Sequence, residues 1–256
     1  MCRLFGLIAN KRVDIHFSFS RFSELSQAHP DGWGIGWYES GFPCVRKEPL
    51  RASESKLVCS TLAGASSSVF VAHVRKATRG SRSRQNCHPF SWKNWLFAHN
   101  GSVDSDALLQ ELDVDRRAAI QGETDSEVFF HWILQNIDRE GSAERGIAEA
   151  LSFVREHYHT GLNFLLSDGR TLYAYREAAK KKDYYSLYYL LRDPRRGLAR
   201  LRSRELGVML ESKALNDERA LLVCSEKLTE EDWRQIPMGC LLTAMGPGSF
   251  RLEKIA

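Results

Sequence analysis

The stretch that decides the fold opens the chain: Met1-Cys2-Arg3-Leu4-Phe5-Gly6-Leu7-Ile8-Ala9, a cysteine followed at once by a compact apolar run. The run Leu4–Ala9 predicts a strand. If the initiator methionine is removed, Cys2 becomes the N-terminus and carries a thiol and an α-amine on one residue. An α-amine has a reference pKa of about 8, so it can act as the base that activates its own nucleophile. Met-Cys alone is an accident in most chains, so the candidate depends on motifs in the rest of the sequence.

Length and composition bound the class of protein. The chain has 256 residues, 43% of them hydrophobic and 27% charged, which is ordinary for a globular protein with a substantial core. A formal net charge of +4 is too small to indicate a nucleic-acid partner. The first apolar run is too short for a signal peptide or a membrane helix. We therefore expect a cytoplasmic protein with no membrane partner; the sequence leaves its oligomeric state open.

Cysteine spacing argues against a metal centre. No two cysteines form a C-x-x-C pair, so neither a zinc ribbon nor a thioredoxin-type site is indicated. Cys87-His88 resembles a fragment of a metal site, but no second pair lies nearby. We expect no metal and no cofactor, and we interpret five of the six cysteines as structural free thiols. The six are Cys2, Cys44, Cys59, Cys87, Cys224 and Cys240.

Hydrophobic patterning predicts mostly strands. Turn signals at Glu39–Phe42 and Ser167–Arg170 indicate two hairpins. The predicted strands are Leu4–Ala9, Trp33–Tyr38, Pro43–Lys47, Val69–Val74, Trp95–Ala98, Leu162–Leu166, Thr171–Tyr175, Tyr184–Leu191, Ala220–Cys224, Cys240–Ala244 and Ser249–Leu252.

Helices are fewer, and the longest has a clear start signal. Thr124 is placed as an N-cap, and Glu127 three residues later completes a capping box. Strands, then a helix pair, then strands again favour antiparallel sheets with segregated helices over alternating βαβ units. No linker divides the chain, so we expect one domain over residues 1–256. The predicted helices are Phe19–Ser26, Ser53–Ala63, Ser105–Leu112, Thr124–Arg139 and Ala143–Tyr158.

Four short segments carry the polar chemistry, each at the end of a predicted strand or the start of a helix, where the backbone can present groups to a ligand. They are Cys2, His73-Val-Arg-Lys-Ala-Thr-Arg-Gly80, Phe97-Ala-His-Asn-Gly101 and Gly122-Glu-Thr-Asp-Ser-Glu127. The side-chain amide of Asn100 and the backbone N–H of Gly101 can converge on one point, as an oxyanion hole requires. The alternative is a plain Asn-Gly turn between strands.

Two charged residues in these segments suit the two ends of an amino acid. Arg75 offers a bidentate fork for a carboxylate, although it could equally be a surface arginine in a basic loop. Asp125 lies in the first turn of a predicted helix, where the dipole keeps a carboxylate charged to receive an ammonium group. The commoner use of an aspartate at that position is helix capping.

The order and spacing of these segments resemble the class II glutamine amidotransferase domain, one of the N-terminal nucleophile hydrolases. The resemblance covers nearly the whole chain, and it is specific because several motifs occur in order. It is strongest to the stand-alone bacterial members, which begin Met-Cys. The further matching motifs are His29-Pro-Asp-Gly-Trp-Gly-Ile-Gly-Trp-Tyr38, Ala52-Ser-Glu-Ser55, Ser225-Glu-Lys-Leu228, Trp233 and Pro237-Met-Gly239.

The resemblance implies a fold and a set of roles. The fold is a four-layer αββα sandwich of two antiparallel sheets, in the α+β class. Cys2 is the nucleophile with its own amine as base, and Asn100 with Gly101 forms the oxyanion hole. Arg75 holds the α-carboxylate of glutamine, Asp125 holds the α-amine, and Thr78 assists. The large synthases carry an R-G-x-D segment near residue 30 whose arginine helps to position the nucleophile; here His29-Pro-Asp-Gly32 takes that place.

The implied reaction is hydrolysis of the γ-amide of glutamine, or of a γ-glutamyl compound, through a thioester. One alternative is a glutaminase subunit that supplies ammonia to a separate synthase subunit. Another is a catalytically idle scaffold that binds an amino acid. Elsewhere, we interpret the arginine-rich segment Arg192–Arg204 as a solvated loop or interface and the tyrosines at 184–189 as β core. The remaining histidines, His88, His131, His157 and His159, are expected to be packing or surface residues.

Overall fold

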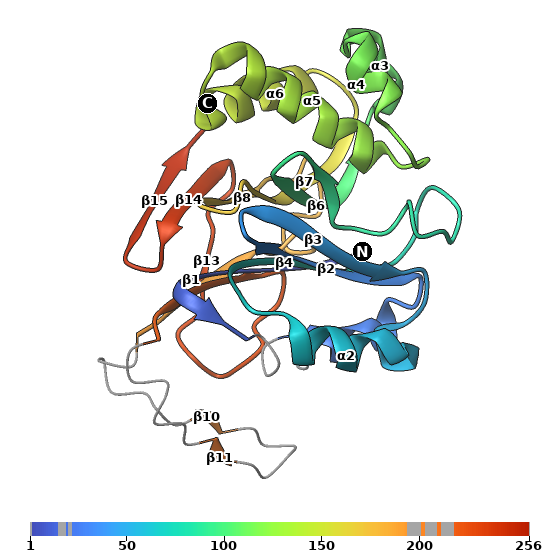
Figure 1. Ribbon diagram of the computed structural model, residues 1–256. Helices are drawn as coiled ribbons and strands as arrows, with labels where there is room; N and C mark the ends of the chain where they lie inside the picture. The colour runs from blue at the N-terminus through green and yellow to red at the C-terminus, as the bar shows by residue number, and fades with distance from the viewer. Residues whose placement is uncertain are drawn as a thin grey trace.

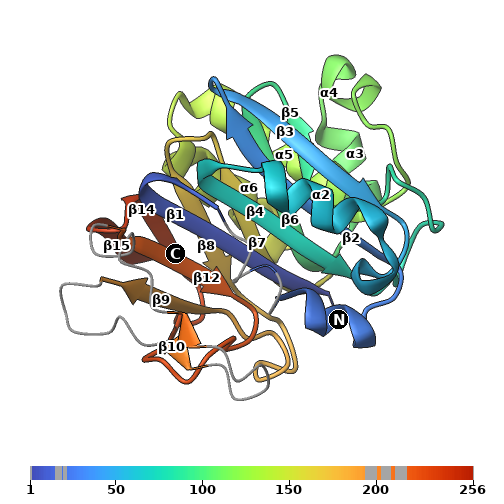
Figure 2. The ribbon, with the colours of Figure 1, turned by 60° about the horizontal axis from the view of Figure 1, so that its bottom comes forward.

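The apolar run that opens the chain forms the middle of a sheet. In the computed structural model, which describes residues 2–14, 19, 22–193, 201–202, 209–210 and 218–255, strand β1 spans Arg3–Val13. It pairs antiparallel with β4 (Ser67–Arg75) on one side and with β12 (Ala220–Cys224) on the other. Figure 2 shows these three strands side by side. The first and last thirds of the chain therefore meet at β1.

Each of the two large sheets is antiparallel. The first has the order β13-β9-β12-β1-β4-β2-β3, and the second has the order β15-β14-β8-β7-β6-β5. The other strands of the first sheet are β2 (Gly32–Glu39), β3 (Phe42–Glu48), β9 (Tyr188–Arg192) and β13 (Arg234–Gln235). Those of the second are β5 (Phe90–Trp92), β6 (Trp95–Val103), β7 (His159–Ser167), β8 (Leu172–Arg176), β14 (Cys240–Gly246) and β15 (Ser249–Lys254). A separate short pair joins β10 (Leu201–Arg202) to β11 (Met209–Leu210).

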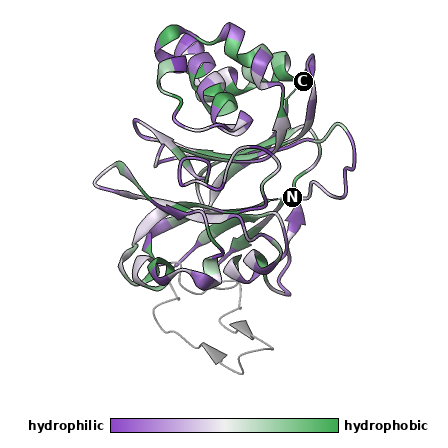
Figure 3. Ribbon diagram, turned by 90° about the vertical axis from the view of Figure 1, so that its right-hand side faces the viewer, coloured by the Kyte–Doolittle hydropathy of each residue, from purple (hydrophilic) through white to green (hydrophobic). Residues whose placement is uncertain are grey.

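Helices cover the outer face of each sheet (Figure 1). Figure 3 shows the layers from the side. α2 (Lys56–Gly64) covers the first sheet, and α5 (Asp125–Glu140) and α6 (Ala143–Arg155) cover the second. The shorter elements are η1 (Leu25–Ala28), η2 (Ala52–Glu54), α3 (Ser105–Glu111) and α4 (Val114–Ala118). The predicted sandwich of two antiparallel sheets with outer helices is confirmed.

The alternation of side chains along β1 builds two of the three apolar cores. Leu4 and Ile8 point between the sheets, where they join residues such as Leu165 of β7. Phe5 and Leu7 point to the opposite face and join the core beneath α2. A third core lies between the second sheet and α5 with α6. Because successive strand residues face opposite sides, one apolar strand serves two layers.

Glycines of β2 let the two sheets approach closely. A Cβ on Gly34 would lie 2.1 Å from the carbonyl oxygen of His88, closer than any real contact. A Cβ on Gly36 would lie 2.9 Å from the side chain of Leu96. The Gly-Trp-Gly-Ile-Gly-Trp motif therefore serves packing on both faces of β2. Its glycines allow the second sheet to pack closely, and Trp33 and Ile35 fill the core beneath α2.

Several predictions of elements need correction. The strand predicted at Tyr184–Leu191 begins only at Tyr188. α4 and β5 were not predicted, because α4 is mostly polar and β5 has three residues. The predicted helix Phe19–Ser26 and the segment Arg192–Arg204 fall partly outside the described residues. Among the helices that the structure describes, none combines the length and the apolar character needed to cross a membrane.

Candidate active site

Cys2 lies at the edge of β1 beside the end of β4. Its Sγ accepts a hydrogen bond from the backbone N–H of Lys76 at 3.3 Å and lies 3.5 Å from the Lys76 carbonyl oxygen. The register explains the contact, because Arg3 pairs with Val74 and so places Cys2 at the end of β4, next to Lys76. Burial raises the pKa of the Cys2 thiol, opposed by the Lys76 hydrogen bond and by the charges of Arg75 and Arg3. The resting group is thus a thiol, with an N–H donor ready for the thiolate.

The late Ser-Glu motif holds the strand that carries Cys2. Ser225 accepts from the backbone N–H of Leu4 through its Oγ at 2.9 Å, and its own N–H donates to the Leu4 carbonyl at 3.0 Å. Glu226 forms an ion pair with Arg3, whose Nη1 donates to the carbonyl oxygen of Cys2 at 3.2 Å. Residues more than 220 positions away in the sequence therefore fix the backbone of the predicted nucleophile.

We expect Glu226→Gln to lower kcat by roughly twofold to tenfold, because loss of the ion pair would let the Cys2 backbone shift and misplace the nucleophile. The free energy of unfolding should change little, since a partly exposed ion pair stabilises a fold only weakly. Steady-state kinetics with a glutamine substrate would measure the change in kcat. Glu231→Gln is the matched control, since Glu231 pairs with Arg192 in the same sheet. Equal kcat losses in the two variants would show that the Arg3–Glu226 pair has no special connection with Cys2.

Asp31, in the segment that lacks the usual arginine, is hydrogen-bonded to the end of β4 and the loop that follows it. Its Oδ2 accepts from the backbone N–H of Ala77 at 2.9 Å, and its own N–H donates to the carbonyl of Arg75 at 3.1 Å. Arg82 donates to the carbonyl of Pro30 at 2.8 Å. The His-Pro-Asp-Gly segment thus anchors the start of the loop at residues 76–82, beside the Lys76 backbone that contacts Cys2.

Arg75 is buried with its guanidinium turned into this loop. It donates to the carbonyl oxygens of Arg79 at 2.8 Å, Gly80 at 3.3 Å and Ser81 at 3.1 Å, and its exposed fraction is 3%. All three acceptors are neutral, and no carboxylate of a described residue forms an ion pair with Arg75. Within the described part of the chain, Arg75 thus has no direct counter-ion, although hydrogen bonds from Ser81 and, with them, the charge of Arg75 lower the pKa of the Glu123 carboxylate. The sequence did not predict that Arg75 shapes the loop as well.

Asp125 lies in the first turn of α5, as predicted, and is almost fully buried. Its Oδ2 accepts one hydrogen bond, from the backbone N–H of Val103 at 2.9 Å, and it forms no ion pair with a described cation. The loop of Arg75 reaches this helix start, since a Cβ on Gly80 would lie 3.3 Å from the methyl carbon of Thr124. Arg75 and Asp125 thus lie on adjoining segments, each with an unpaired charge.

The predicted capping box is half right. Thr124 is the N-cap and accepts from the backbone N–H of Glu127. The carboxylate of Glu127, however, accepts from the N–H groups of Gln121 at 3.1 Å and Gly122 at 2.7 Å. The chain turns sharply before the helix. This turn brings the N–H groups of Gln121 and Gly122, instead of the N–H of Thr124, within reach of the Glu127 carboxylate.

Asn100 and Gly101 lie within β6, so the plain-turn alternative is wrong. Asn100 is 2% exposed, and its amide Nδ2 is a buried donor without a hydrogen-bond partner among the described residues. Buried donors are almost always paired, so such an orphan calls for a functional reason. A Cβ on Gly101 would lie 1.7 Å from the carbonyl oxygen of Gly161 on the neighbouring strand. Only glycine fits where the two backbones approach.

We expect Gly101→Ala to lower the free energy of unfolding by about 3 kcal/mol or more, because the new methyl group meets rigid backbone. Denaturant titration followed by circular dichroism would measure the loss. Gly64→Ala is the control, since nothing lies within 4 Å of a Cβ there. A Gly101→Ala protein as stable as the parent would contradict the close approach of β6 and β7.

Tyr185 lies next to the site. From the sequence alone it was assigned to the β core. Its ring covers Gly161, where a Cβ would lie 2.3 Å from the ring, and its hydroxyl lies 3.0 Å from Oγ1 of Thr160. Burial raises the pKa of Tyr185, and the neighbouring titratable groups of Tyr184, Tyr158 and Cys2 act in the same direction. Thr78, in contrast, is exposed on the loop after β4, and its hydroxyl makes no hydrogen bond to a described residue. No sequence signal distinguished Tyr185 from the other tyrosines.

Three histidines pack between and beside these segments. Nδ1 of His88 lies 2.9 Å from Nε2 of His73, and His99 lies 2.9 Å from Oγ of Ser126. Burial lowers the pKa of all three imidazoles, so they are neutral at pH 7. His88 is buried, and its other ring nitrogen, Nε2, has no hydrogen-bond partner among the described residues. Among the described residues, no group of three or more metal-ligating side chains could hold a metal ion.

Comparison with known proteins identifies the class. The sequence model of the class II glutamine amidotransferases matches residues 1–252, so the chain belongs to this family. YafJ of Escherichia coli K12 is 31% identical over 255 residues, covering 93% of this chain and 95% of YafJ.

Solved structures share the fold. A glutamine aminotransferase class-II domain protein of Silicibacter pomeroyi superimposes with a TM-score of 0.67 at 21% identity, covering both chains completely. The glutamine phosphoribosylpyrophosphate amidotransferase of Bacillus subtilis gives a TM-score of 0.68 at 18% identity, over all of this chain and 49% of its own. At these identities the likeness extends to the fold alone.

Proposed function

We propose that this amidotransferase is an N-terminal cysteine hydrolase of the γ-amide of glutamine or of a γ-glutamyl compound. With Met1 removed, the α-amine of Cys2 takes the thiol proton as Sγ attacks the γ-carbonyl carbon. The protonated amine then gives this proton to the leaving nitrogen, which departs as ammonia or an amine. Water attacks the thioester, the amine again takes the proton, and glutamate leaves as Cys2 recovers its thiol.

The observation that carries the proposal is the orphan amide of Asn100. A buried donor with no partner in the resting protein is available for an oxygen that becomes negative only during reaction. The N–H of Gly101 supplies the second donor. Because both are held in a strand, they need no reorganisation when charge develops.

Recognition of the amino-acid end rests on the two unpaired charges. Arg75 is a buried cation bonded to neutral carbonyls, and Asp125 is a buried anion bonded to one N–H. A buried charge without a counter-ion favours a ligand of opposite sign. We assign the substrate α-carboxylate to Arg75, with Thr78 beside it, and the α-ammonium to Asp125.

A substrate panel would test the proposal. Purified protein is incubated with glutamine and with γ-glutamyl amides and peptides, and release of glutamate and of ammonia or amine is measured. We expect turnover of at least one γ-glutamyl compound and none with Cys2→Ala. Steady ammonia release from glutamine without an acceptor would favour simple hydrolysis over an ammonia-supplying subunit. Binding of amino acids without turnover by the protein lacking Met1 would support the scaffold alternative and contradict the proposal.

A further inference from the structure

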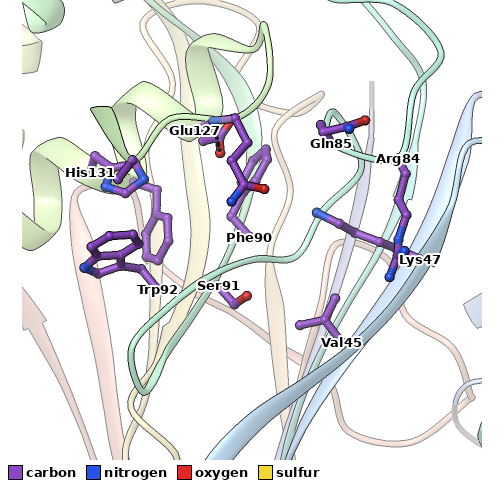
Figure 4. Close-up of a pocket in the computed structure, with 12 residues that line it drawn as sticks. Val45, Lys47, Arg84, Gln85, Phe90, Ser91, Trp92, Glu127 and His131 are labelled. Atoms are coloured by element: carbon purple, nitrogen blue, oxygen red, sulfur yellow. Dashed lines mark hydrogen bonds between the residues drawn. The ribbon is translucent and has the colours of Figure 1, made fainter. Parts of the chain in front are cut away.

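A cavity of about 300 Å³ lies apart from the residues assigned above. Its walls come from β3, residues 84–85, β5, the connection before α5 and α5 itself (Figure 4). None of Cys2, Arg75, Asn100 or Asp125 lines it. This volume is at the lower end of small-molecule sites, enough for a single ring with its substituents.

One side of the cavity is positive. Lys47 donates through Nζ to the carbonyls of Cys87 at 2.7 Å and Pro89 at 3.2 Å, which fixes the ammonium in place. Burial lowers the pKa of Lys47 to about 8, so the group remains mostly protonated at pH 7. Arg84 is exposed at the same side, and no carboxylate of a described residue pairs with it. The two cations are therefore placed to share one anionic group.

The acidic residue that lines the cavity offsets only part of this positive charge. Glu127 is 6% exposed, and its two carboxylate oxygens accept from the backbone N–H groups of Gln121 and Gly122. Its charge is thus already solvated by the turn before α5. Glu127 still acts to raise the pKa of Lys47, so Arg84 is the main free partner for a ligand anion on this side.

The opposite side of the cavity is aromatic. Figure 4 shows Trp92 and His131 across the cavity from Lys47 and Arg84, with Phe90 between them. The rings of Trp92 and His131 meet edge to face with centroids 5.4 Å apart. Such surfaces favour a flat apolar body, which buries area against the rings.

His131 adds a polar atom that lacks a partner. The residue is 2% exposed, and its Nδ1 makes no hydrogen bond to any described residue. Burial, with the nearby charge of Arg116, lowers the pKa of His131 to about 4, so the ring is neutral at pH 7. A buried polar atom without a partner costs free energy, which a polar substituent of a ligand would recover. The expectation that His131 is merely a packing residue leaves this atom unexplained.

We propose that this cavity binds a small organic anion, an acidic group carried on a flat ring. The acidic group lies at Lys47 and Arg84, and the ring lies between Phe90 and Trp92. A polar ring substituent reaches Nδ1 of His131. This site is independent of the proposed hydrolysis at Cys2, so either assignment can fail without the other.

Calorimetric titration of the full chain tests the proposal with benzoate as the probe. Benzamide has the same ring without the charge, and acetate has the charge without the ring. We expect saturable binding of benzoate at least tenfold tighter than that of either analogue, roughly 1.4 kcal/mol in binding free energy. Absence of saturable benzoate binding below about 10 mM, or equal affinity for benzamide, would overturn the proposal.

Three variants locate the binding. Arg84→Gln should weaken benzoate about tenfold through loss of a charge-assisted contact, and Ser91→Trp should abolish binding by filling the cavity mouth. Lys56→Gln, which removes an exposed charge at the start of α2, should change nothing. Circular dichroism confirms folding of each variant. Because Arg84 is exposed, its variant gives a result even if Ser91→Trp does not fold. Unchanged benzoate affinity in Arg84→Gln would place the binding elsewhere and overturn the proposal.

Discussion

Replacing Asn100 with alanine is expected to lower kcat about 10²–10³-fold, the usual cost of one oxyanion donor. KM should change little, since the amide has no partner in the resting protein and is proposed to bond only the oxygen that becomes negative. Steady-state kinetics with the best substrate of the panel would separate the two parameters. A raised KM at unchanged kcat would reassign Asn100 to ground-state binding.

A second buried asparagine provides the control for this variant. Asn136 is 4% exposed on α5, and its amide donates to the carbonyl of Trp132 at 2.9 Å. Asn136→Ala should therefore lower stability while leaving kcat close to that of the parent. Comparable kcat losses in both variants would indicate general loosening of the fold and would remove the special role of Asn100.

Replacing Asp125 with asparagine is expected to reduce kcat/KM for a γ-glutamyl substrate by tens- to thousands-fold. Removing one partner of a desolvated ion pair costs roughly 2–5 kcal/mol, much of it from the charge left behind. The amide oxygen of asparagine can still accept from the N–H of Val103, so the fold should persist. The loss should largely disappear for a substrate analogue without the α-amine, and this difference is the decisive readout.

Asp104→Asn is the matched control. Asp104 also accepts a backbone N–H at a helix start, from Ala107 at 3.1 Å, but at the N-cap of α3. Its replacement removes the same charge from a similar position and should leave selectivity unchanged. If Asp125→Asn keeps the parent's kcat/KM and its preference for substrates with an α-amine, the role of Asp125 is only structural, as the acceptor of the hydrogen bond from the Val103 N–H.

The antiparallel sheets with segregated helices could be predicted from the order of strands and helices, and the four-layer arrangement from the family resemblance. The alternation of side chains explains how one strand can contact two layers. β1 shows this clearly, as Leu4 and Phe5 enter different cores. The residues at which strands begin and end were harder to predict from the sequence. Tyr184 and Tyr185 have strong strand propensity, yet they precede β9, because tertiary packing over Gly161 outweighs propensity at those positions.

The candidate site could be predicted as a set of segments but not as a set of contacts. Spacing identified the segments of Cys2, Arg75, Asn100 and Asp125, and register explains why two of them meet, since Arg3 lies opposite Val74. The hydrogen bonds of Arg75 depend on how the loop at residues 79–81 turns back, which no residue pattern states. The anchoring of Leu4 by Ser225 depends on pairing across most of the chain.

The central claim is that Cys2 is a free N-terminal nucleophile, and one mass-spectrometric experiment tests it. Active protein is treated with a diazo-ketone analogue of glutamine, and intact mass and peptide mapping locate the adduct. We predict that Met1 is absent and that a single adduct lies on Cys2, with glutamine protecting it. Cys59 serves as the internal control, because it is exposed and would report mere accessibility. Fully active protein that retains Met1, or labelling of Cys59 equal to that of Cys2, would contradict the account.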